Sequence, residues 1–280
     1  MERCGHPGCV RGWAGAGHCC RQACYSANFE SRQRHSQLPR GRRETVLCGC
    51  RNLNPHHVQD GSELPATFGM SEDKIGYLIA GGRTAMFETL ADAEDDAVEG
   101  HRAASACKAG DALIAIAASG STPYTIAVAK RAKELGATVI AVVNNPNSGL
   151  AAAADMEIFL DSGPEVIMGS TRMGAGSAQK AALNLLSTLT HIKLGAVHDG
   201  MMVNVRADNL KLKARACNIV SRIAKASEKD AAAALETSKG EVKPAVLICS
   251  GASSIGEARK LLVETKGNLR LALKKLAATQ

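Results

Sequence analysis

Short apolar runs alternate with segments of helical periodicity through the middle of the chain. Runs of strand length occupy residues 75–80, 111–117, 137–143 and 156–160. Helical spacing occupies residues 84–97, 123–135 and 174–194. Strands and helices that alternate with short connections predict an α/β fold with a doubly wound parallel sheet.

From about residue 206 the pattern becomes helical. The spacing predicts helices over residues 209–224, 228–237, 254–265 and 268–276. The apolar run 246–249 fits either a strand or a buried helical turn, and periodicity leaves both open. No internal repeat is evident. The chain is therefore expected to hold an α/β domain over 58–205 and a small C-terminal helical domain over 206–280.

The first 57 residues show neither the periodicity of a strand nor that of a helix. They hold nine Arg, no Lys, three acidic residues and seven of the ten Cys. A zinc module would need paired Cys-x-x-Cys spacing, which does not occur here, and an Arg-rich arm could neutralise nucleic-acid phosphates. We favour a third interpretation, in which 1–57 is not an evolved fold but a mis-started or out-of-frame N-terminus, and we expect it to be disordered.

Composition narrows the classes that the rest of the chain can belong to. With 45% hydrophobic but only 3% aromatic residues, the core must be built from Ala, Val, Leu and Ile. Residues 58–280 hold 25 basic and 24 acidic residues, so no basic face for nucleic acid is expected.

No apolar run reaches the roughly 18 residues of a membrane span, and no secretory signal is recognisable. Three scattered thiols after residue 57 fit a reducing cytosol, so a cytoplasmic protein is expected.

The strand predicted over 111–117 leads directly into a loop of three hydroxyls and a glycine, followed by Pro123. Ligands of open α/β sheets bind beyond the carboxyl ends of the strands. Pro123 suits the first position of a helix, where N–H groups and the helix dipole favour an anion. An ordinary N-cap needs only one hydroxyl, so we favour a phosphate site. The candidate phosphate-binding residues are Ser119, Gly120, Ser121 and Thr122.

A second turn of this kind precedes the helix predicted over 174–194. Ser170 and Thr171 stand there beside Arg172. Either hydroxyl could bind an anion or cap the helix, and the spacing leaves both interpretations open.

Several motifs together resemble one known family. They are D-G-S-E-L-P-A-T-F-G at 60–69, L-I-A-G-G at 78–82, A-E-D-D at 93–96, A-A-S-G-S-T-P-Y at 117–124 and G-S-T-R-M-G-A-G-S-A-Q-K at 169–180. In this order and spacing they are similar to the N-acetylmuramic acid 6-phosphate etherases, which carry a SIS (sugar isomerase) domain. The resemblance covers about residues 58–280.

The resemblance implies a homodimeric lyase without metal or cofactor, whose partner is a small sugar phosphate. Such enzymes remove D-lactate from N-acetylmuramic acid 6-phosphate and give N-acetylglucosamine 6-phosphate, a step in cell-wall sugar recycling. By motif, Glu63 and Glu94 match the two catalytic glutamates of the family, Glu63 as the acid toward lactate and Glu94 as the base at carbon 2. Breaking an ether beta to an aldehyde needs two such proton transfers.

Two other side chains could take part in catalysis by their type, but both are expected to be buried in the core. His191 lies in an apolar helix and is expected to be a satisfied core histidine. Cys107 has no positioned base nearby in the sequence and is expected to fill the core.

The chain departs from the family ahead of Asp60. At that place the family has a strand and a Gly/Ser/Thr-rich loop, whereas this chain has residues 51–57 without such a loop. The resemblance therefore implies that one wall of the expected sugar-phosphate pocket is absent. Three alternatives follow: a non-catalytic SIS sensor of sugar phosphates, akin to the inhibitory regulator of glucokinase; a sugar-phosphate isomerase; or an inactive product of a disrupted gene.

Overall fold

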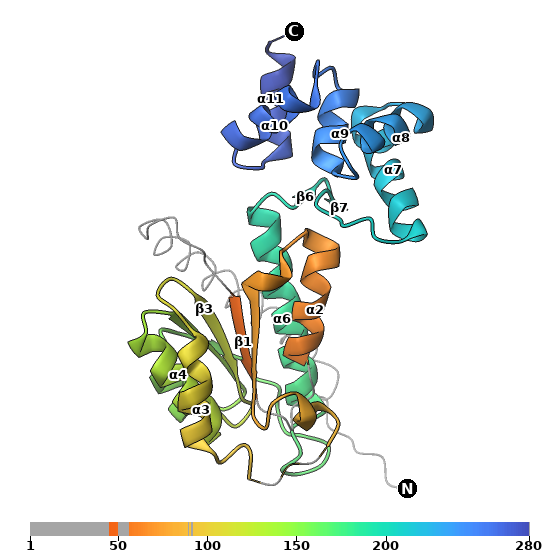
Figure 1. Ribbon diagram of the computed structural model, residues 1–280. Helices are drawn as coiled ribbons and strands as arrows, with labels where there is room; N and C mark the ends of the chain where they lie inside the picture. The colour runs from red at the N-terminus through yellow and green to blue at the C-terminus, as the bar shows by residue number, and fades with distance from the viewer. Residues whose placement is uncertain (1–44, 50–55, 89, 91, 280) are drawn as a thin grey trace, which may run out of the picture. The chain divides into compact units, whose positions relative to one another are not determined.

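The computed structural model describes residues 45–49, 56–88, 90 and 92–279. Its central feature is a parallel five-stranded sheet in the order β2-β1-β3-β4-β5 (Figure 1). The strands are β1 (Thr45–Gly49), β2 (Ile75–Ile79), β3 (Ala112–Ile116), β4 (Thr138–Val143) and β5 (Met156–Phe159). The four strands predicted after residue 58 and their parallel arrangement are confirmed.

Strand β1 corrects the expectation that residues 1–57 lie outside the fold. Thr45–Gly49 pairs with β2 on one side and with β3 on the other. The helix α2 (His56–Phe68) also begins inside that segment, and its His57 is buried. The run T-V-L-C-G is as long as β2 and β3, but it lies in an Arg- and Cys-rich segment whose composition favoured disorder. The rest of the predicted disordered segment, 1–44 and 50–55, lies outside the described residues.

Helices flank the sheet, and one of those predicted does not form. The predicted helix over 84–97 is wrong: a 3₁₀ turn η3 (Arg83–Met86) and irregular backbone with Asp92 at φ 59° take its place. The helix α3 (Ala97–Ala103) begins only at Ala97, where Asp96 caps it by accepting from the N–H of Glu99 at 2.8 Å. The other helices here are α4 (Pro123–Glu134), α5 (Gly149–Ala153) and α6 (Gly174–Lys193), with 3₁₀ turns η2 (Glu72–Lys74) and η4 (Ala104–Ala106).

The core beside the sheet is built from small and branched aliphatic side chains, as the composition predicts. Helices α3 and α4 lie side by side (Figure 1) and contribute to this core together with β3 and β4. Among the described residues, Tyr124 is the one fully buried aromatic member of this core, at 1% exposure. Cys107 is buried there, and burial, with a smaller contribution from Asp111, raises the pKa of its thiol to about 11, which confirms the core-filling interpretation.

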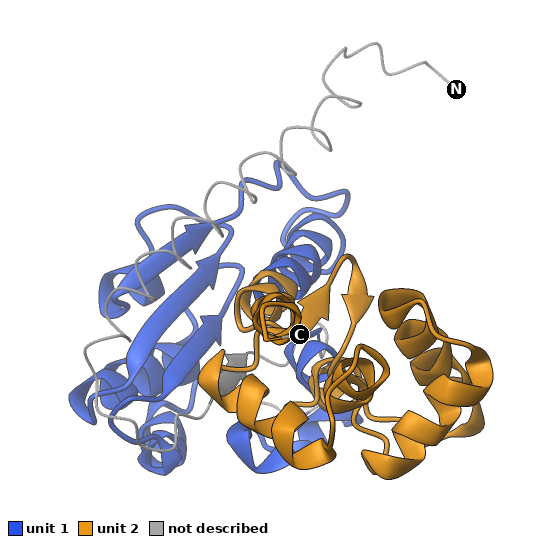
Figure 2. Cartoon of the chain, turned by 90° about the horizontal axis from the view of Figure 1, so that it is seen from above, with its two compact units in different colours: residues 1–61, 72–186 blue, residues 62–71, 187–280 orange. Residues whose placement is uncertain are grey.

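The chain divides into two compact units, coloured separately in Figure 2. The first contains residues 1–61 and 72–186, and the second contains residues 62–71 and 187–280. The sequence pattern predicted a boundary at residue 205/206 and assigned no earlier segment to the helical part. In the second unit, the short antiparallel strands β6 (Val197–His198) and β7 (Met201–Met202) precede five helices. These are α7 (Leu210–Ala224), α8 (Glu228–Thr237), α9 (Val242–Cys249), α10 (Ile255–Glu264) and α11 (Leu269–Ala277).

The run 246–249 belongs to a helix, since α9 extends from Val242 to Cys249. Its residues Ala245, Val246 and Leu247 are fully buried between neighbouring helices. A segment that is apolar all round is typical of a helix inside a bundle, which explains why periodicity could not decide its type.

Helices α8–α9 and α10–α11 form a tandem repeat with a period of 27 residues, contrary to the expectation of no repeat. Ser227 and Ser254 cap the first helix of each pair by accepting from the N–H group three residues later. Three further equivalent pairs are buried: Ala231 and Ala258, Val242 and Leu269, Ala245 and Ala272.

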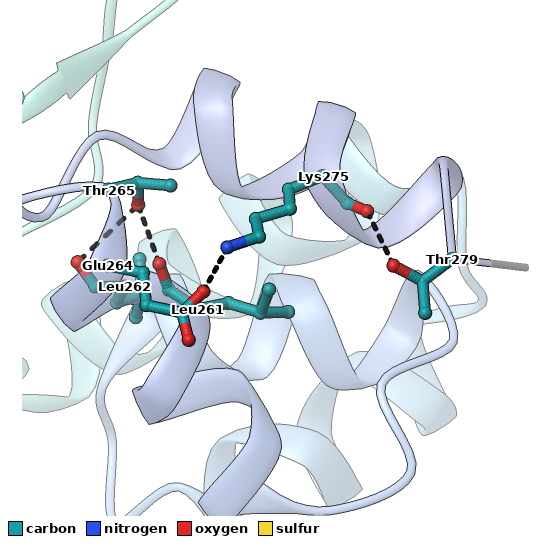
Figure 3. Close-up of polar contacts among 6 residues, drawn as sticks. All are labelled: Leu261, Leu262, Glu264, Thr265, Lys275 and Thr279. Carbon is teal, nitrogen blue, oxygen red and sulfur yellow. Dashed lines mark hydrogen bonds and ion pairs between the residues drawn. The ribbon is translucent and has the colours of Figure 1, made fainter.

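The turns inside the two pairs match as closely. Lys239 and Lys266 have φ of 56° and 54°, and Gly240 and Gly267 follow at 84° and 77°. The C-cap residue that follows the first helix of each pair carries a hydroxyl, as Ser238 or Thr265. Figure 3 shows the second turn, where the Thr265 hydroxyl donates to the carbonyls of Leu261 and Leu262, while Lys275 pairs with Glu264 and the Thr279 hydroxyl donates to the carbonyl of Lys275.

The repeat is hard to see in the sequence because residues at equivalent positions of the two copies are similar in size and polarity but seldom identical. The stretches E-T-S-K-G-E-V (236–242) and V-E-T-K-G-N-L (263–269) carry the signal. Comparing the chain with itself at a shift of 27 residues would have found it.

Candidate functional site

The serine loop, residues 119–122, lies at the carboxyl end of β3, where the sequence placed it. The exposed hydroxyls of Ser119 and Ser121 are neighbours, since Ser121 Oγ donates to Ser119 Oγ at 3.0 Å. The N–H of Ser121 also donates to Ser119 Oγ, at 3.2 Å. Thr122 is the N-cap residue of α4 and is buried, with no cap bond from its side chain, and Pro123 is the first helical residue. Two exposed hydroxyls therefore lie together at a helix N-terminus.

The backbone of Glu94 is bonded directly to the start of α4. The N–H of Tyr124 donates to the carbonyl of Glu94 at 2.9 Å. This bond uses one of the first-turn N–H groups that were expected to face a ligand. It also places the half-exposed Glu94 beside the serine loop.

The second predicted anion turn precedes α6, and a side chain of the protein already occupies that helix end. The carboxylate of Glu165 accepts from the N–H of Gly174 at 2.9 Å and from that of Ala175 at 2.8 Å. Slight burial raises the pKa of Glu165, but these backbone bonds outweigh it and hold the pKa below its usual value. Ser170 and Thr171 are half-buried in the preceding turn, and the cap of α6 is Glu165.

The two turns converge in the first unit. Ala118, which precedes Ser119, packs against Ala175 in the first turn of α6, and both are almost fully buried. The rule that identified Ser119, a polar residue shortly after the carboxyl end of a strand, would also have found Asn144 after β4. The structure therefore brings together the serine loop, Glu94 and the turn at Ser170 and Thr171 within one unit.

Glu63 lies on α2 and belongs to the second unit. Its side chain is exposed. The end of this helix is held by Phe68, which stacks on His191 with ring centroids 4.3 Å apart. The N–H of Arg206 donates to the carbonyl of Ala66 at 3.2 Å. These contacts fix the segment that carries Glu63 within its own unit.

His191 is a core histidine, as predicted. It is 8% exposed, and its Nδ1 lies 2.8 Å from the carbonyl oxygen of Ser187. His198 is also buried, and burial lowers its pKa despite the opposing charge of Asp199, whose Oδ2 lies 3.4 Å from His198 Nε2.

Neither a metal-binding cluster nor a membrane-spanning helix occurs in the part of the chain that the structure describes. No three His, Cys, Asp or Glu side chains gather there as a group that could hold a metal ion. None of the helices described there has the length and apolar character needed to cross a membrane.

A parallel sheet flanked by helices, with hydroxyls at the carboxyl end of a central strand, is the architecture of an open-sheet α/β protein with a ligand site at that edge. The chain matches the SIS domain family over residues 87–189. The N-acetylmuramic acid 6-phosphate etherase of Streptomyces avermitilis is 41% identical over 239 residues, which cover 85% of this chain and 76% of that protein. The chain therefore belongs to the N-acetylmuramic acid 6-phosphate etherase family.

Two further similarities concern a relative and a solved structure. The etherase of Symbiobacterium thermophilum is 48% identical over 191 residues, 68% of this chain, and the match spans 64% of that relative's length, less than two thirds. Among solved structures, a phosphoheptose isomerase from Neisseria gonorrhoeae has 17% identity and a TM-score of 0.45, covering 67% of this chain and 93% of that one.

Proposed function

We propose that this protein cleaves the D-lactyl ether of N-acetylmuramic acid 6-phosphate, giving N-acetylglucosamine 6-phosphate and D-lactate. The observation that carries the proposal is the bond between the Tyr124 N–H and the backbone carbonyl of Glu94, which ties the residue that bears the proposed basic carboxylate to the start of α4, next to the serine loop. A phosphate bound by Ser119 and Ser121 would place the sugar within reach of that carboxylate. Family membership supplies the identity of the substrate.

In this proposal the two glutamates divide the proton transfers. Glu94 takes the proton at carbon 2 of the open-chain sugar, which the neighbouring aldehyde makes acidic. Glu63 gives a proton to the lactate oxygen that leaves carbon 3. Loss of the carbon-2 proton and of lactate leaves a double bond between carbons 2 and 3, and water then adds to it. All atoms are accounted for, so the reaction needs neither oxidant nor reductant.

The phosphate group is assigned to Ser119, Gly120, Ser121 and Thr122, with Ser170 and Thr171 on the other side. The adjacent hydroxyls of Ser119 and Ser121 and the contact of Ala118 with Ala175 support this assignment. Neutral donors at a helix N-terminus bind a phosphate while still allowing it to leave.

We also propose that the active species is a cytoplasmic homodimer. The first unit exposes large apolar side chains in its loops, including Phe87 at 90% and Met168 at 98%. Contiguous exposed apolar patches are typical of interfaces, and the proposal takes these side chains to belong to such a patch. Cys107, Cys217 and Cys249 are free thiols, as expected in a reducing compartment. Light scattering at micromolar concentration should give the mass of a dimer, and a monomeric mass would contradict the proposal.

The activity is tested by measuring D-lactate release from the substrate by the unmutated chain and by Ser119→Ala. Loss of one phosphate donor should raise KM by about tenfold and leave kcat within a factor of about three. Ser105→Ala, which removes an exposed hydroxyl elsewhere in the same unit, is the matched control. Binding of the sugar phosphate without any lactate release would instead favour the non-catalytic sensor.

A further inference from the structure

A pair of hydrogen-bonded amide side chains, of which Gln179 is buried and Asn144 is half-buried, links α6 to the segment next to the serine loop. Gln179 on α6 is 1% exposed, and its Nε2 donates to Asn144 Oδ1 at 2.9 Å. Buried amides are costly unless they are hydrogen-bonded, and Ala182 and Leu183 show that aliphatic side chains fill neighbouring buried positions of α6. An amide at Gln179 therefore points to a specific partner rather than to general packing.

Asn144 joins the carboxyl ends of three strands. The backbone N–H of Asn144 donates to the backbone carbonyl of Ala118 at 3.0 Å, directly before the serine loop. Its Nδ2 donates to the carbonyl of Leu160 at 2.9 Å and to Ser162 Oγ at 3.3 Å. One residue after β4 thus contacts the segments that follow β3 and β5, and Gln179 links it to α6.

The consequence for the loop follows from the contact of Ala118 with Ala175. Alanine side chains meet at only one methyl group each, so this contact alone leaves the loop free to shift along α6. The polar links through Asn144 and Gln179 are directional and restrict that shift.

We propose that Asn144 and Gln179 are positioning residues, which hold the serine loop at a fixed place against the first turns of α6. This inference rests on the proposed phosphosugar site, because the loop is its phosphate-binding half. Neither residue touches the substrate in this arrangement; both act through Ala118 and its neighbour Ser119.

The test compares Gln179→Met with Leu183→Ala, one helical turn further along α6. Both variants lose buried contacts and should melt at lower temperature. Only Gln179→Met leaves the Asn144 acceptor unpaired, so it should weaken binding of N-acetylglucosamine 6-phosphate and of inorganic phosphate by about tenfold in calorimetry. Leu183→Ala should stay within about twofold of the unmutated chain, since it leaves the amide pair in place.

A second readout does not depend on the ligand. Amide hydrogen exchange of residues 117–124 should accelerate in Gln179→Met and remain unchanged in Leu183→Ala. Asn144→Asp provides a second variant, because it keeps an acceptor for Gln179 and loses the donor to Leu160, and it should also accelerate exchange.

Equal exchange and equal affinity in Gln179→Met and Leu183→Ala would overturn the positioning role. If the unmutated chain binds neither probe while Gln179→Met still accelerates exchange of residues 117–124, the positioning of the loop stands and the proposed phosphosugar function fails.

Discussion

Gly120 and Ser148 lie so close that no other residue fits at position 120. A Cβ atom on Gly120 would lie 2.2 Å from Oγ and 2.4 Å from Cβ of Ser148. Gly120 also has φ of 65°, a conformation that L side chains rarely adopt. The N–H of Leu150 donates to the carbonyl of Gly120 at 2.8 Å and fixes the loop against the start of α5.

Gly120→Ala should therefore lower the free energy of unfolding by about 2–4 kcal/mol, from backbone strain and the clash together. Ser148→Gly in the same chain should recover the part that is due to the clash. Ser148→Gly alone should cost only a few tenths of a kcal/mol, although Ser148 caps α5. Urea denaturation of the three variants measures the coupling, and equal stability of Gly120→Ala with and without Ser148→Gly would show that no clash exists.

Two glycines inside helices should respond in opposite directions to alanine. In α3, a Cβ on Gly100 would lie 2.5 Å from the carbonyl oxygen of Tyr124, so Gly100→Ala should destabilise by about 1–3 kcal/mol. In α10, a Cβ on Gly256 would meet only Ser254 Oγ at 3.6 Å, so Gly256→Ala should stabilise by about 0.5–1 kcal/mol. Thermal unfolding of both variants checks the contrast, and a neutral Gly100→Ala would mean that α3 can move away from α4 freely.

His57 should make stability fall in acid. Burial, with a smaller contribution from the charge of His56, lowers the pKa of His57 from 6.5 to about 4. Between these values the unfolded chain binds a proton that the folded chain does not, so stability is lost as pH falls from 6.5 to about 4 and no further below it. The loss is on the order of 3 kcal/mol. His57→Leu should flatten this part of the pH profile of urea denaturation, whereas the exposed control His101→Gln should keep it.

The two glutamates should fail differently if each has the proposed role. Glu94→Gln removes the base, so neither exchange of the carbon-2 proton with deuterated water nor lactate release should remain. Glu63→Gln removes only the acid, so exchange should persist while lactate release falls by about 10²–10⁴-fold. NMR follows the exchange beside a lactate assay, and full lactate release by Glu94→Gln would refute the assigned base.

The tandem repeat predicts equal costs at equivalent glycines. Gly240 and Gly267 both have positive φ, and an added Cβ would meet nothing within 4 Å at Gly240 and only Lys243 Nζ at 3.7 Å at Gly267. Each change to alanine should therefore cost about 1–2 kcal/mol, from backbone strain alone. Chemical denaturation should give values within about 0.5 kcal/mol of each other; a difference above about 1 kcal/mol would mean that the two turns are not energetically equivalent.

The sequence by itself determined the elements whose pattern is local. Strands β2–β5 and helices α4, α6, α7, α8, α10 and α11 follow from apolar runs, helical spacing and end signals such as Pro123 and Gly136. The serine loop followed as well, because the end of a parallel strand is recognisable from the run that precedes it.

Only the tertiary structure decided the features that depend on distant partners. The strand β1 exists because β2 and β3 supply its hydrogen bonds, and α3 begins late because Asp92 and Asp96 shape the backbone before it. The bond from Tyr124 to Glu94 and the capping of α6 by Glu165 join residues that no sequence period relates. Local periodicity reports which face of an element is buried, but which polar groups meet across elements is fixed only once the elements pack.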